Sequence, residues 1–457
     1  MHKLHFHPER HWLNDPNGLC QSDGWYHMFF QHNPLANAWG NIHWGHARSR
    51  DLYAWEEMPV ALSPATELGE VHCFSGSCCK DQDGKPHFFY TSIGREEDGR
   101  GVTDGAQQWT ASASDPGMVT LTQSCEHALR QDMHRGLTVR DWRDPCVVFD
   151  GKRYLMVTGG CVDGRGSILL YTSTDLVNWN FKRILAQSDT ADGVPWECPN
   201  LALLGGTAVL IYSPCATVRY KVGRLDSRLH FIQSHEDVLD AGADRSFYAP
   251  QCFRDDSGRT LMFGWMAESA PDEYIEKQGF NGCMTLPREM TIVDGDLWCL
   301  PVDGWQKWVR PTQLLTVRQG QQITVDAGQH FILRMTVEAA ACPFIRLMGA
   351  PDGTDGAMLL LKNEGERITM RLMNSIALPE GQRAYSPATR SAPVRDGKAD
   401  IFLCVDGTTV ECCVNGHWLS GRIYPRHERA TQLTLQCSQS PARRRLRPTE
   451  AELYLMK

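Results

Sequence analysis

Hydrophobic positions in the N-terminal part of this chain gather in short runs that are rich in Phe, Tyr, Leu, Ile and Val. Such residues suit a half-buried pleated surface, and a glycine turn precedes each run, so the pattern predicts β-strands. The preceding turns are Asp23-Gly24, Asp83-Gly84, Asp150-Gly151, Gly205-Gly206 and Ser257-Gly258. The predicted strands are 25–31, 87–92, 154–158, 208–213 and 260–266.

A second pattern, of small and polar residues that end in aspartate, recurs after three of these runs. Its copies are Ala47-Arg48-Ser49-Arg50-Asp51, Ala111-Ser112-Ala113-Ser114-Asp115 and Tyr171-Thr172-Ser173-Thr174-Asp175. The turn glycines are about fifty to seventy residues apart, and repeats near this length with several strands each are typical of propeller blades. Five copies therefore predict a five-bladed β-propeller over residues 1–303, with insertions such as the loop 94–107.

The C-terminal part alternates in short runs that are separated by turns such as Asp406-Gly407 and Asn415-Gly416. The predicted strands are 331–337, 358–361, 368–373, 400–406, 410–414, 433–437 and 453–456. Many short strands at this spacing predict a β-sandwich over residues 317–457. Residues 304–316 lack alternation and are interpreted as a linker, and the arginines at 443–445 and 447 are expected in a solvated loop. The chain is thus predicted to be all-β.

Three carboxylates occupy corresponding places in the N-terminal repeat. Asp15 lies in Trp12-Leu13-Asn14-Asp15-Pro16-Asn17-Gly18, Asp144 in Arg143-Asp144-Pro145, and Glu197 in Trp196-Glu197-Cys198-Pro199. Each motif precedes an apolar run and a turn glycine. The other two copies have Phe74-Ser75-Gly76-Ser77 and Tyr248-Ala249-Pro250-Gln251 there, without an acid. Because equivalent positions in a closed repeat array converge, we expect one acidic site.

Paired carboxyl groups that flank one bond are what cleavage of a glycosidic bond requires. The alternative is that the Asp15 and Asp144 motifs are simple turns, because Asx and Pro pre-set the backbone. Glu197 has no nearby turn role, which favours the catalytic interpretation. We expect Trp196 and Cys198 to desolvate Glu197 and favour its protonated form, whereas Arg143 should favour ionised Asp144.

Further residues suit a sugar pocket, which needs both flat apolar faces and hydrogen-bonding groups. The candidate faces are Trp12, Trp39, Trp44, Phe74 and Trp265, and the candidate polar groups are Asn14, Gln31, Ser75 and Arg143. For Trp44 an ordinary core position is an equal alternative.

Composition narrows the function classes. The net charge is −8 and the chain has no basic run, so the sequence lacks the positive patch that nucleic-acid-binding proteins need. No apolar stretch approaches the length of a membrane span, and no apolar signal segment precedes the first motif. The 17 cysteines contain no CxxC pair, which favours reduced thiols in a cytoplasmic protein over a zinc site. His2, His5, His7 and His11 are expected to form a polar edge, so no metal and no cofactor are predicted.

These motifs resemble those of glycoside hydrolase family 32, the β-fructofuranosidases. The resemblance runs from His5 to about Glu289, and more faintly through 405–425. The matching stretches are WLNDPNG, FFQHNP, WGNIHWGHARSRDLYAW, CFSGS, WRDP, WECPN, YAPQCF, FGWM and MTLPREM. Pro250 and Cys252 in YAPQCF depart from the more usual small or hydroxyl residues.

The resemblance implies a five-bladed propeller with a β-sandwich and a retaining mechanism without a metal. It implies that Asp15 is the nucleophile, Glu197 the general acid/base and Asp144 a stabiliser of the transition state. It also implies a fructosyl subsite made of Trp12, Asn14, Gln31, Trp39, Phe74, Ser75, Arg143 and Trp265.

We therefore expect an enzyme that releases β-fructofuranosyl units from sucrose or short fructo-oligosaccharides, with a small carbohydrate as its partner. Two alternatives stay open: a fructosyltransferase and an inverting furanosidase of the same fold. A non-catalytic carbohydrate-binding propeller would lack at least one of the acids, and all three are present. The acids of an inverting enzyme would be about 6.5–9.5 Å apart rather than about 5–5.5 Å.

The loop 132–141 carries His134, Arg135 and Arg140 and is a candidate cationic rim for a phosphorylated leaving group. The alternative is that its side chains pair with Asp132 and Asp141 at the surface.

Overall fold

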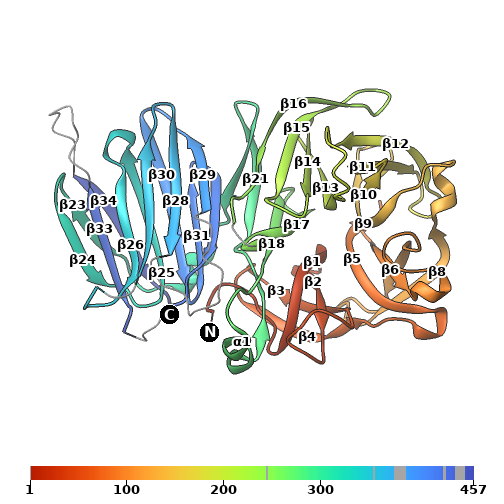
Figure 1. Cartoon of the computed structure of the whole chain (residues 1–457), viewed down its shortest axis with the longest axis horizontal. Helices are drawn as coiled ribbons and strands as arrows, with labels where there is room; N and C mark the ends of the chain where they lie inside the picture. The colour runs from red at the N-terminus through yellow and green to blue at the C-terminus, as the bar shows by residue number, and fades with distance from the viewer. Residues whose placement is uncertain (1, 243–244, 354–355, 375–387, 426–428, 438–447) are drawn as a thin grey trace.

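The computed structural model describes residues 2–242, 245–353, 356–374, 388–425, 429–437 and 448–457. Within these ranges the chain is built almost entirely of β-strands (Figure 1). Five sheets of four or five strands lie in the right-hand half of Figure 1, and two six-stranded sheets lie in the left-hand half. The α-helix of these ranges is α1 (Asp272–Gln278), and short 3-10 turns occupy Thr66–Leu68, Glu96–Asp98, Gln131–His134, Trp305–Trp308 and Ala339–Ala341.

The five smaller sheets follow one another along the chain. The first holds β1 (His11–Ser22), β2 (Trp25–Asn33), β3 (His43–Ser49) and β4 (Trp55–Leu62), with β19 (Phe280–Asn281) parallel to β1. The second holds β5 (Glu70–Lys80), β6 (Pro86–Gly94), β7 (Gln107–Ala113) and β8 (Leu121–Leu129). The third holds β9 (Arg140–Phe149), β10 (Tyr154–Val162), β11 (Arg165–Ser173) and β12 (Asn180–Gln187).

The fourth sheet holds β13 (Glu197–Leu204), β14 (Thr207–Ser213), β15 (Arg219–Leu225) and β16 (Phe231–Val238). The fifth holds β17 (Tyr248–Arg254), β18 (Thr260–Met266), β20 (Cys283–Met284), β21 (Arg288–Val293) and β22 (Asp296–Pro301). The strands predicted after the glycine turns are confirmed as β2, β6, β10, β14 and β18. The loop expected at 94–107 is confirmed as the connection between β6 and β7.

The first strands of the five sheets contact one another in a closed order, β1–β5–β9–β13–β17–β1. The pairing of each first strand with the second strand of its sheet is interrupted by a β-bulge at a corresponding place. At the bulge, two residues of the first strand lie opposite one residue of the second. These bulged pairs are Asn14-Asp15, Phe74-Ser75, Asp144-Pro145, Cys198-Pro199 and Ala249-Pro250. A bulge bends a strand and re-aims its side chains. The motifs that could have been simple turns are thus bulges inside inner strands.

The two larger sheets are formed by the C-terminal part. One holds β23 (Gln313–Val317), β34 (Thr449–Leu455), β25 (His330–Glu338), β30 (Lys398–Asp406), β31 (Thr409–Val414) and β32 (His417–Arg422). The other holds β24 (Gln322–Asp326), β33 (Gln432–Cys437), β26 (Pro343–Gly349), β27 (Ala357–Asn363), β28 (Arg367–Asn374) and β29 (Ala388–Pro393). Apolar side chains of both sheets, such as Leu333 and Leu359, belong to one buried cluster.

The seven strands predicted in this part are all present, but β23, β24, β26, β29 and β32 were not predicted. β23 begins at Gln313, inside the segment interpreted as a linker, because it pairs with β34. The arginines at 443–445 and 447 lie outside the described residues. None of the helices in the described ranges has the length and apolar character needed to cross a membrane.

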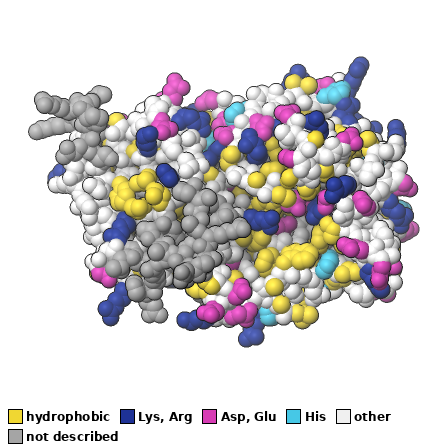
Figure 2. Space-filling view, in the orientation of Figure 1, with side chains coloured by type: hydrophobic (Ala, Val, Ile, Leu, Met, Phe, Trp, Pro, Cys, Tyr) yellow, Lys and Arg dark blue, Asp and Glu magenta, His cyan; other side chains and the backbone are white. Residues whose placement is uncertain are grey.

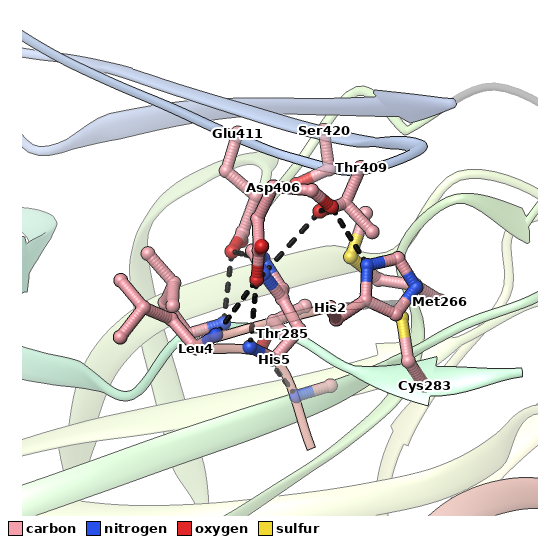
Figure 3. A network of polar contacts seen from close by, with 12 residues as sticks. His2, Leu4, His5, Met266, Cys283, Thr285, Asp406, Thr409, Glu411 and Ser420 are labelled. Atoms are coloured by element: carbon pink, nitrogen blue, oxygen red, sulfur yellow. Dashed lines mark hydrogen bonds and ion pairs between the residues drawn. The ribbon is translucent and has the colours of Figure 1, made fainter. Parts of the chain in front are cut away.

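The N-terminal segment lies between the two parts of the molecule and is held by a buried ionic network (Figure 3). The carboxylate of Asp406 accepts hydrogen bonds from the backbone N–H groups of Lys3, Leu4 and His5. His5 Nδ1 lies 2.9 Å from Asp406 Oδ2, and His5 Nε2 lies 2.8 Å from Glu411 Oε2. Arg288 of β21 reaches Glu411 at 2.6 Å and Asp240 at 2.8 Å.

Every acid in this network therefore has a basic partner. Burial acts to lower the pKa of His5, but the hydrogen bonds that His5 donates to Asp406 and Glu411 outweigh it and raise the pKa to about 9. Burial acts to raise the pKa of Asp406, yet His330 and His5 hold it well below its ordinary value. The polar edge expected for the N-terminal histidines is wrong for His5, which is buried between the two parts and pairs there with Asp406 and Glu411.

Candidate active site

A pocket of about 410 Å³ opens at the bulges of the inner strands. In the right-hand half of Figure 2, where the five smaller sheets lie, the surface is hollowed and hydrophobic side chains gather around the hollow. The lining residues are Trp12, Asn14, Asp15, Gln31, Trp39, Phe74, Val102, Arg143, Asp144, Glu197, Cys198, Arg245, Tyr248 and Trp265. The expected convergence of the three acids is therefore present in the structure.

The three acids do not occupy one strict position of the repeat. Asp15 is the second residue of its bulge, Asp144 is the first residue of its bulge, and Glu197 directly precedes its bulge. Relative to the bulge, the three acids thus occupy three successive positions, each on a different strand. Their carboxyl groups nevertheless line one pocket. Asp144 has a left-handed φ of 61°, which shows how strongly the bulge redirects the chain there.

Asp15 on β1 is buried and is held by neutral donors. Its Oδ2 accepts a hydrogen bond of 2.6 Å from Ser75 Oγ, and its Oδ1 accepts one of 3.1 Å from Asn14 Nδ2. Burial raises the pKa of Asp15, although the hydrogen bonds from Ser75 and Asn14 oppose the shift, and the charge of Glu197 adds to it. Ser75 does not line the pocket but lies behind Asp15, where it fixes the carboxylate.

Asp144 on β9 is also buried. Its Oδ2 accepts a hydrogen bond of 2.8 Å from the backbone N–H of Cys198, and its own N–H donates to Thr91 Oγ1 at 2.8 Å. Burial raises the pKa of Asp144 to about 7, and the charge of Arg143 offsets only part of this shift. The expected effect of Arg143 is present, since its charge favours the ionised form of Asp144, but desolvation is the larger effect and the net shift is upward.

Glu197 begins β13 and is the most exposed of the three acids, since its side chain is 22% exposed. Its Oε2 accepts a hydrogen bond of 2.6 Å from the Tyr248 hydroxyl, and its Oε1 lies 3.6 Å from Arg143 Nη1. Arg143 also reaches Asp141 Oδ1 at 2.6 Å. The carboxyl group of Glu197 is therefore reached by solvent while its position is fixed by Tyr248 and Arg143.

The expected desolvation of Glu197 by its sequence neighbours is wrong. Trp196 stacks on Tyr212 at a ring distance of 4.0 Å and does not line the pocket. The Cys198 thiol instead lies 3.3 Å from Asp15 Oδ2 and 3.5 Å from Asp144 Oδ2. Cys198 is part of the bulge that follows Glu197, which redirects its side chain, whereas Trp196 precedes the bulge.

The remaining predicted pocket residues surround the acids. Trp12 meets Trp265 edge-on at 5.8 Å and donates to Asn14 Oδ1 at 2.6 Å. Asn14 Nδ2 in turn donates to Gln31 Oε1 at 3.0 Å. Trp39 and Phe74 form the opposite apolar wall, and Trp39 is 53% exposed. Trp44, by contrast, is fully buried in the core.

Sequence reasoning missed Val102, Arg245 and Tyr248, which also line the pocket. Tyr248 precedes its bulge in β17, as Glu197 does in β13, so the fifth copy of the repeat was a signal that could have identified it. Arg245 lies between two strands and follows no pattern of the repeat. Val102 belongs to the long β6–β7 connection.

The charged loop 132–141 is not the rim that its sequence suggested. His134 is buried against Trp142 and lies 2.7 Å from the Tyr171 hydroxyl, so it cannot face a ligand in the pocket. Arg135 and Arg140 are exposed but are not among the lining residues. The pocket's cations are Arg143 and Arg245. Within the described residues, no group of three or more His, Cys, Asp or Glu side chains could hold a metal ion.

Comparison with known proteins identifies the family. Residues 5–301 match the profile of the glycosyl hydrolases family 32 N-terminal domain. The chain belongs to glycosyl hydrolase family 32. This family 32 chain is 30% identical to a sucrose-6-phosphate hydrolase from Escherichia coli, over 96% of its own length and 92% of the relative's. It is 31% identical to a sucrose-6-phosphate hydrolase from Zymomonas mobilis, over 92% and 86% of the two chains.

Solved structures share the fold of this family 32 enzyme over its whole length. The crystal structure of fructan 1-exohydrolase IIa from Cichorium intybus gives a TM-score of 0.85 at 21% identity and covers 100% of this chain and 97% of that one. A family 32 β-fructofuranosidase from Bombyx mori gives a TM-score of 0.80 at 25% identity, with 100% and 94% covered. The chain is a glycoside hydrolase, and its pocket holds the acids that this chemistry needs.

Proposed function

We propose that this enzyme is a retaining β-fructofuranosidase that releases β-fructofuranosyl units from sucrose or short fructo-oligosaccharides. The observation that carries the proposal is that buried Asp15, buried Asp144 and partly exposed Glu197 line one pocket. Relatives named sucrose-6-phosphate hydrolase and raffinose invertase support the substrate class.

In the first step Asp15 attacks the anomeric carbon of the fructosyl unit while Glu197 gives its proton to the leaving oxygen. In the second step Glu197 takes a proton from water, which attacks the same carbon and releases Asp15. Ser75 and Asn14 orient the attacking carboxylate, and Tyr248 orients Glu197. Two inversions restore the original configuration.

Asp144 is proposed to bind hydroxyl groups of the fructosyl ring and to stabilise positive charge at the anomeric carbon. The fructosyl subsite is proposed to consist of Trp12, Asn14, Gln31, Trp39, Phe74, Arg143 and Trp265. Its lining combines aromatic faces with hydrogen-bonding groups, which a sugar ring requires. Ser75, which was predicted with them, is proposed to act from behind Asp15, because it donates to that carboxylate but does not line the pocket. No metal or cofactor is needed for either step.

The five smaller sheets are proposed to be blades of a five-bladed β-propeller over residues 1–303. The closed order of the inner strands supports this interpretation. The two larger sheets, with one shared apolar cluster, are proposed to be a β-sandwich. Because β23 begins at Gln313, the linker is 304–312 and the sandwich is 313–457. A cytoplasmic location stays a prediction.

Early-time NMR of sucrose cleavage tests the proposal. We expect β-fructofuranose as the first product, and the opposite anomer would replace the proposal with an inverting furanosidase. Product analysis on sucrose, inulobiose, inulin and levan then separates hydrolysis from transfer, because a transferase would build longer oligosaccharides as substrate concentration rises.

A further inference from the structure

Arg245 is a pocket cation that none of the proposed catalytic steps uses. Its backbone lies just before β17, and its carbonyl accepts a hydrogen bond of 2.9 Å from the N–H of Ala267, which fixes the chain at the pocket edge. Its φ is 62°, an uncommon value for a residue with a side chain. The side chain is exposed and lies with its guanidinium carbon 5.0 Å from the centre of the Tyr248 ring.

The contacts of Tyr248 place this cation relative to the reaction. The Tyr248 hydroxyl donates to Glu197, and the N–H of Cys215 donates to the same hydroxyl at 3.0 Å. Glu197 is the proposed acid and so marks where the leaving oxygen must lie. Asp15, with Ser75 and Asn14 behind it, marks the fructosyl side instead. Arg245 therefore stands on the leaving-group side of the pocket.

The two pocket arginines differ in the number of carboxylates with which they form ion pairs. Arg143 pairs with both Asp141 and Glu197 and is only 13% exposed in its side chain. Among the residues that the structure describes, Arg245 forms no ion pair. An exposed guanidinium that rests on an aromatic ring is held in place yet keeps its N–H donors free for an anion.

Building on the proposed function, we propose that Arg245 binds a phosphate group on the leaving unit of the substrate and sets a preference for phosphorylated over neutral sugars. Arginine suits this role because its planar fork makes paired charge-assisted hydrogen bonds with phosphate oxygens. The cationic rim is thus formed by Arg245, before β17, and not by the loop 132–141.

The test compares the specificity constants (kcat/KM) for sucrose 6-phosphate, which carries phosphate on its glucosyl unit, and for sucrose. The parent should prefer the phosphorylated sugar. Arg245→Gln should lower the ratio of the two constants by roughly ten- to a hundredfold, the usual effect of losing a charge-assisted hydrogen bond. Arg245→Lys should retain part of the preference, since it keeps the charge and loses the fork. Arg140→Gln, an exposed arginine outside the pocket lining, is the matched control and should keep the parent ratio.

An unchanged ratio in Arg245→Gln would overturn the proposal. So would an equal loss for both sugars, because that result would mean that Arg245 only positions Tyr248. Calorimetric titration with glucose 6-phosphate and with glucose gives a second readout that needs no turnover. If neither sucrose nor its phosphate is cleaved, the proposed function fails, but weaker glucose 6-phosphate binding in Arg245→Gln would still support the site, and equal binding would reject it.

Discussion

Two groups of buried acids in this molecule differ in their charged partners and in the direction in which their pKa values shift. At the junction of the two parts, Asp406 and Glu411 are matched by His5, His330 and Arg288. The pKa of each of these two acids is lowered despite complete burial. In the pocket, burial raises the pKa values of Asp15 and Asp144, and their hydrogen bonds and the charge of Arg143 offset only part of the shift.

The difference teaches that burial alone does not decide the state of a carboxyl group. Burial acts to raise the pKa of all four acids, and only the number of basic partners reverses the shift. The junction uses charge to hold three segments together. The pocket leaves its acids without full compensation, which is common where carboxyl groups carry out chemistry.

The largest expected effect is on the nucleophile. Asp15→Asn should lower kcat for sucrose by roughly 10⁴-fold or more, because the amide keeps the shape but cannot attack the anomeric carbon. The melting temperature should not fall, since the variant removes a charge that burial disfavours. Steady-state kinetics and thermal unfolding measure both. Full activity in this variant would falsify the assignment.

The acid/base residue should show a substrate-dependent loss. Glu197→Gln should lower kcat for sucrose by about 10²- to 10⁴-fold, because the leaving oxygen then receives no proton. The loss should be much smaller for formation of the fructosyl-enzyme from β-fructofuranosyl fluoride, which leaves without protonation. Burst kinetics with both substrates test this difference, and equal losses would argue against the acid role.

At the junction of the two parts, replacing a buried aspartate by asparagine should lower the stability of the folded protein and leave the catalytic steps unaffected. Asp406→Asn leaves His5 and His330 without their shared partner, so unfolding should become easier by about 3–5 kcal/mol. Urea unfolding of the Asp406→Asn and Asp15→Asn variants measures the difference between their free energies of unfolding. If Asp406→Asn were as stable as the parent, the network would not hold the two parts together.

The pH dependence of stability should separate the two regions. The folded-state pKa of Asp144, about 7, is above the unfolded value, so its favourable effect is complete below about pH 4 and is lost as pH rises to about 7. Asp144→Asn should therefore melt higher than the parent at pH 8, with no gain near pH 4.

The pKa of His5 is raised to about 9, so its contribution to the stability of the folded protein should be lost between about pH 6.5 and 9. The His5→Gln variant should not show this pH-dependent loss of stability.

The smallest expected effect is that of chelation. Activity should be the same with and without EDTA, because the proposed steps use carboxyl groups alone. A loss in EDTA that zinc or calcium restores would indicate a metal ligand set among the histidines or cysteines and would require a different account of the pocket.

The repeat pattern was enough to predict the strands around the pocket and the convergence of Asp15, Asp144 and Glu197. Each of these predictions follows from periodicity, because strands that recur at one place in a closed array bring their ends together. The N-terminal histidines and the loop 132–141 could not be placed in the same way. Their neighbours, Asp406 for His5 and Trp142 for His134, are set by packing between separate elements.

The amino-acid sequence by itself determined the all-β character, the strand repeat, the family and the three acids that meet in the pocket. Only the tertiary structure decided the direction in which the pKa of each buried acid shifts, what faces Glu197, and which arginines line the pocket. The physical reason is that strand patterns depend on neighbours along the chain. Burial and charge pairing depend on groups such as Tyr248 and Cys198 that come from other strands, at bulges whose direction no local pattern specifies.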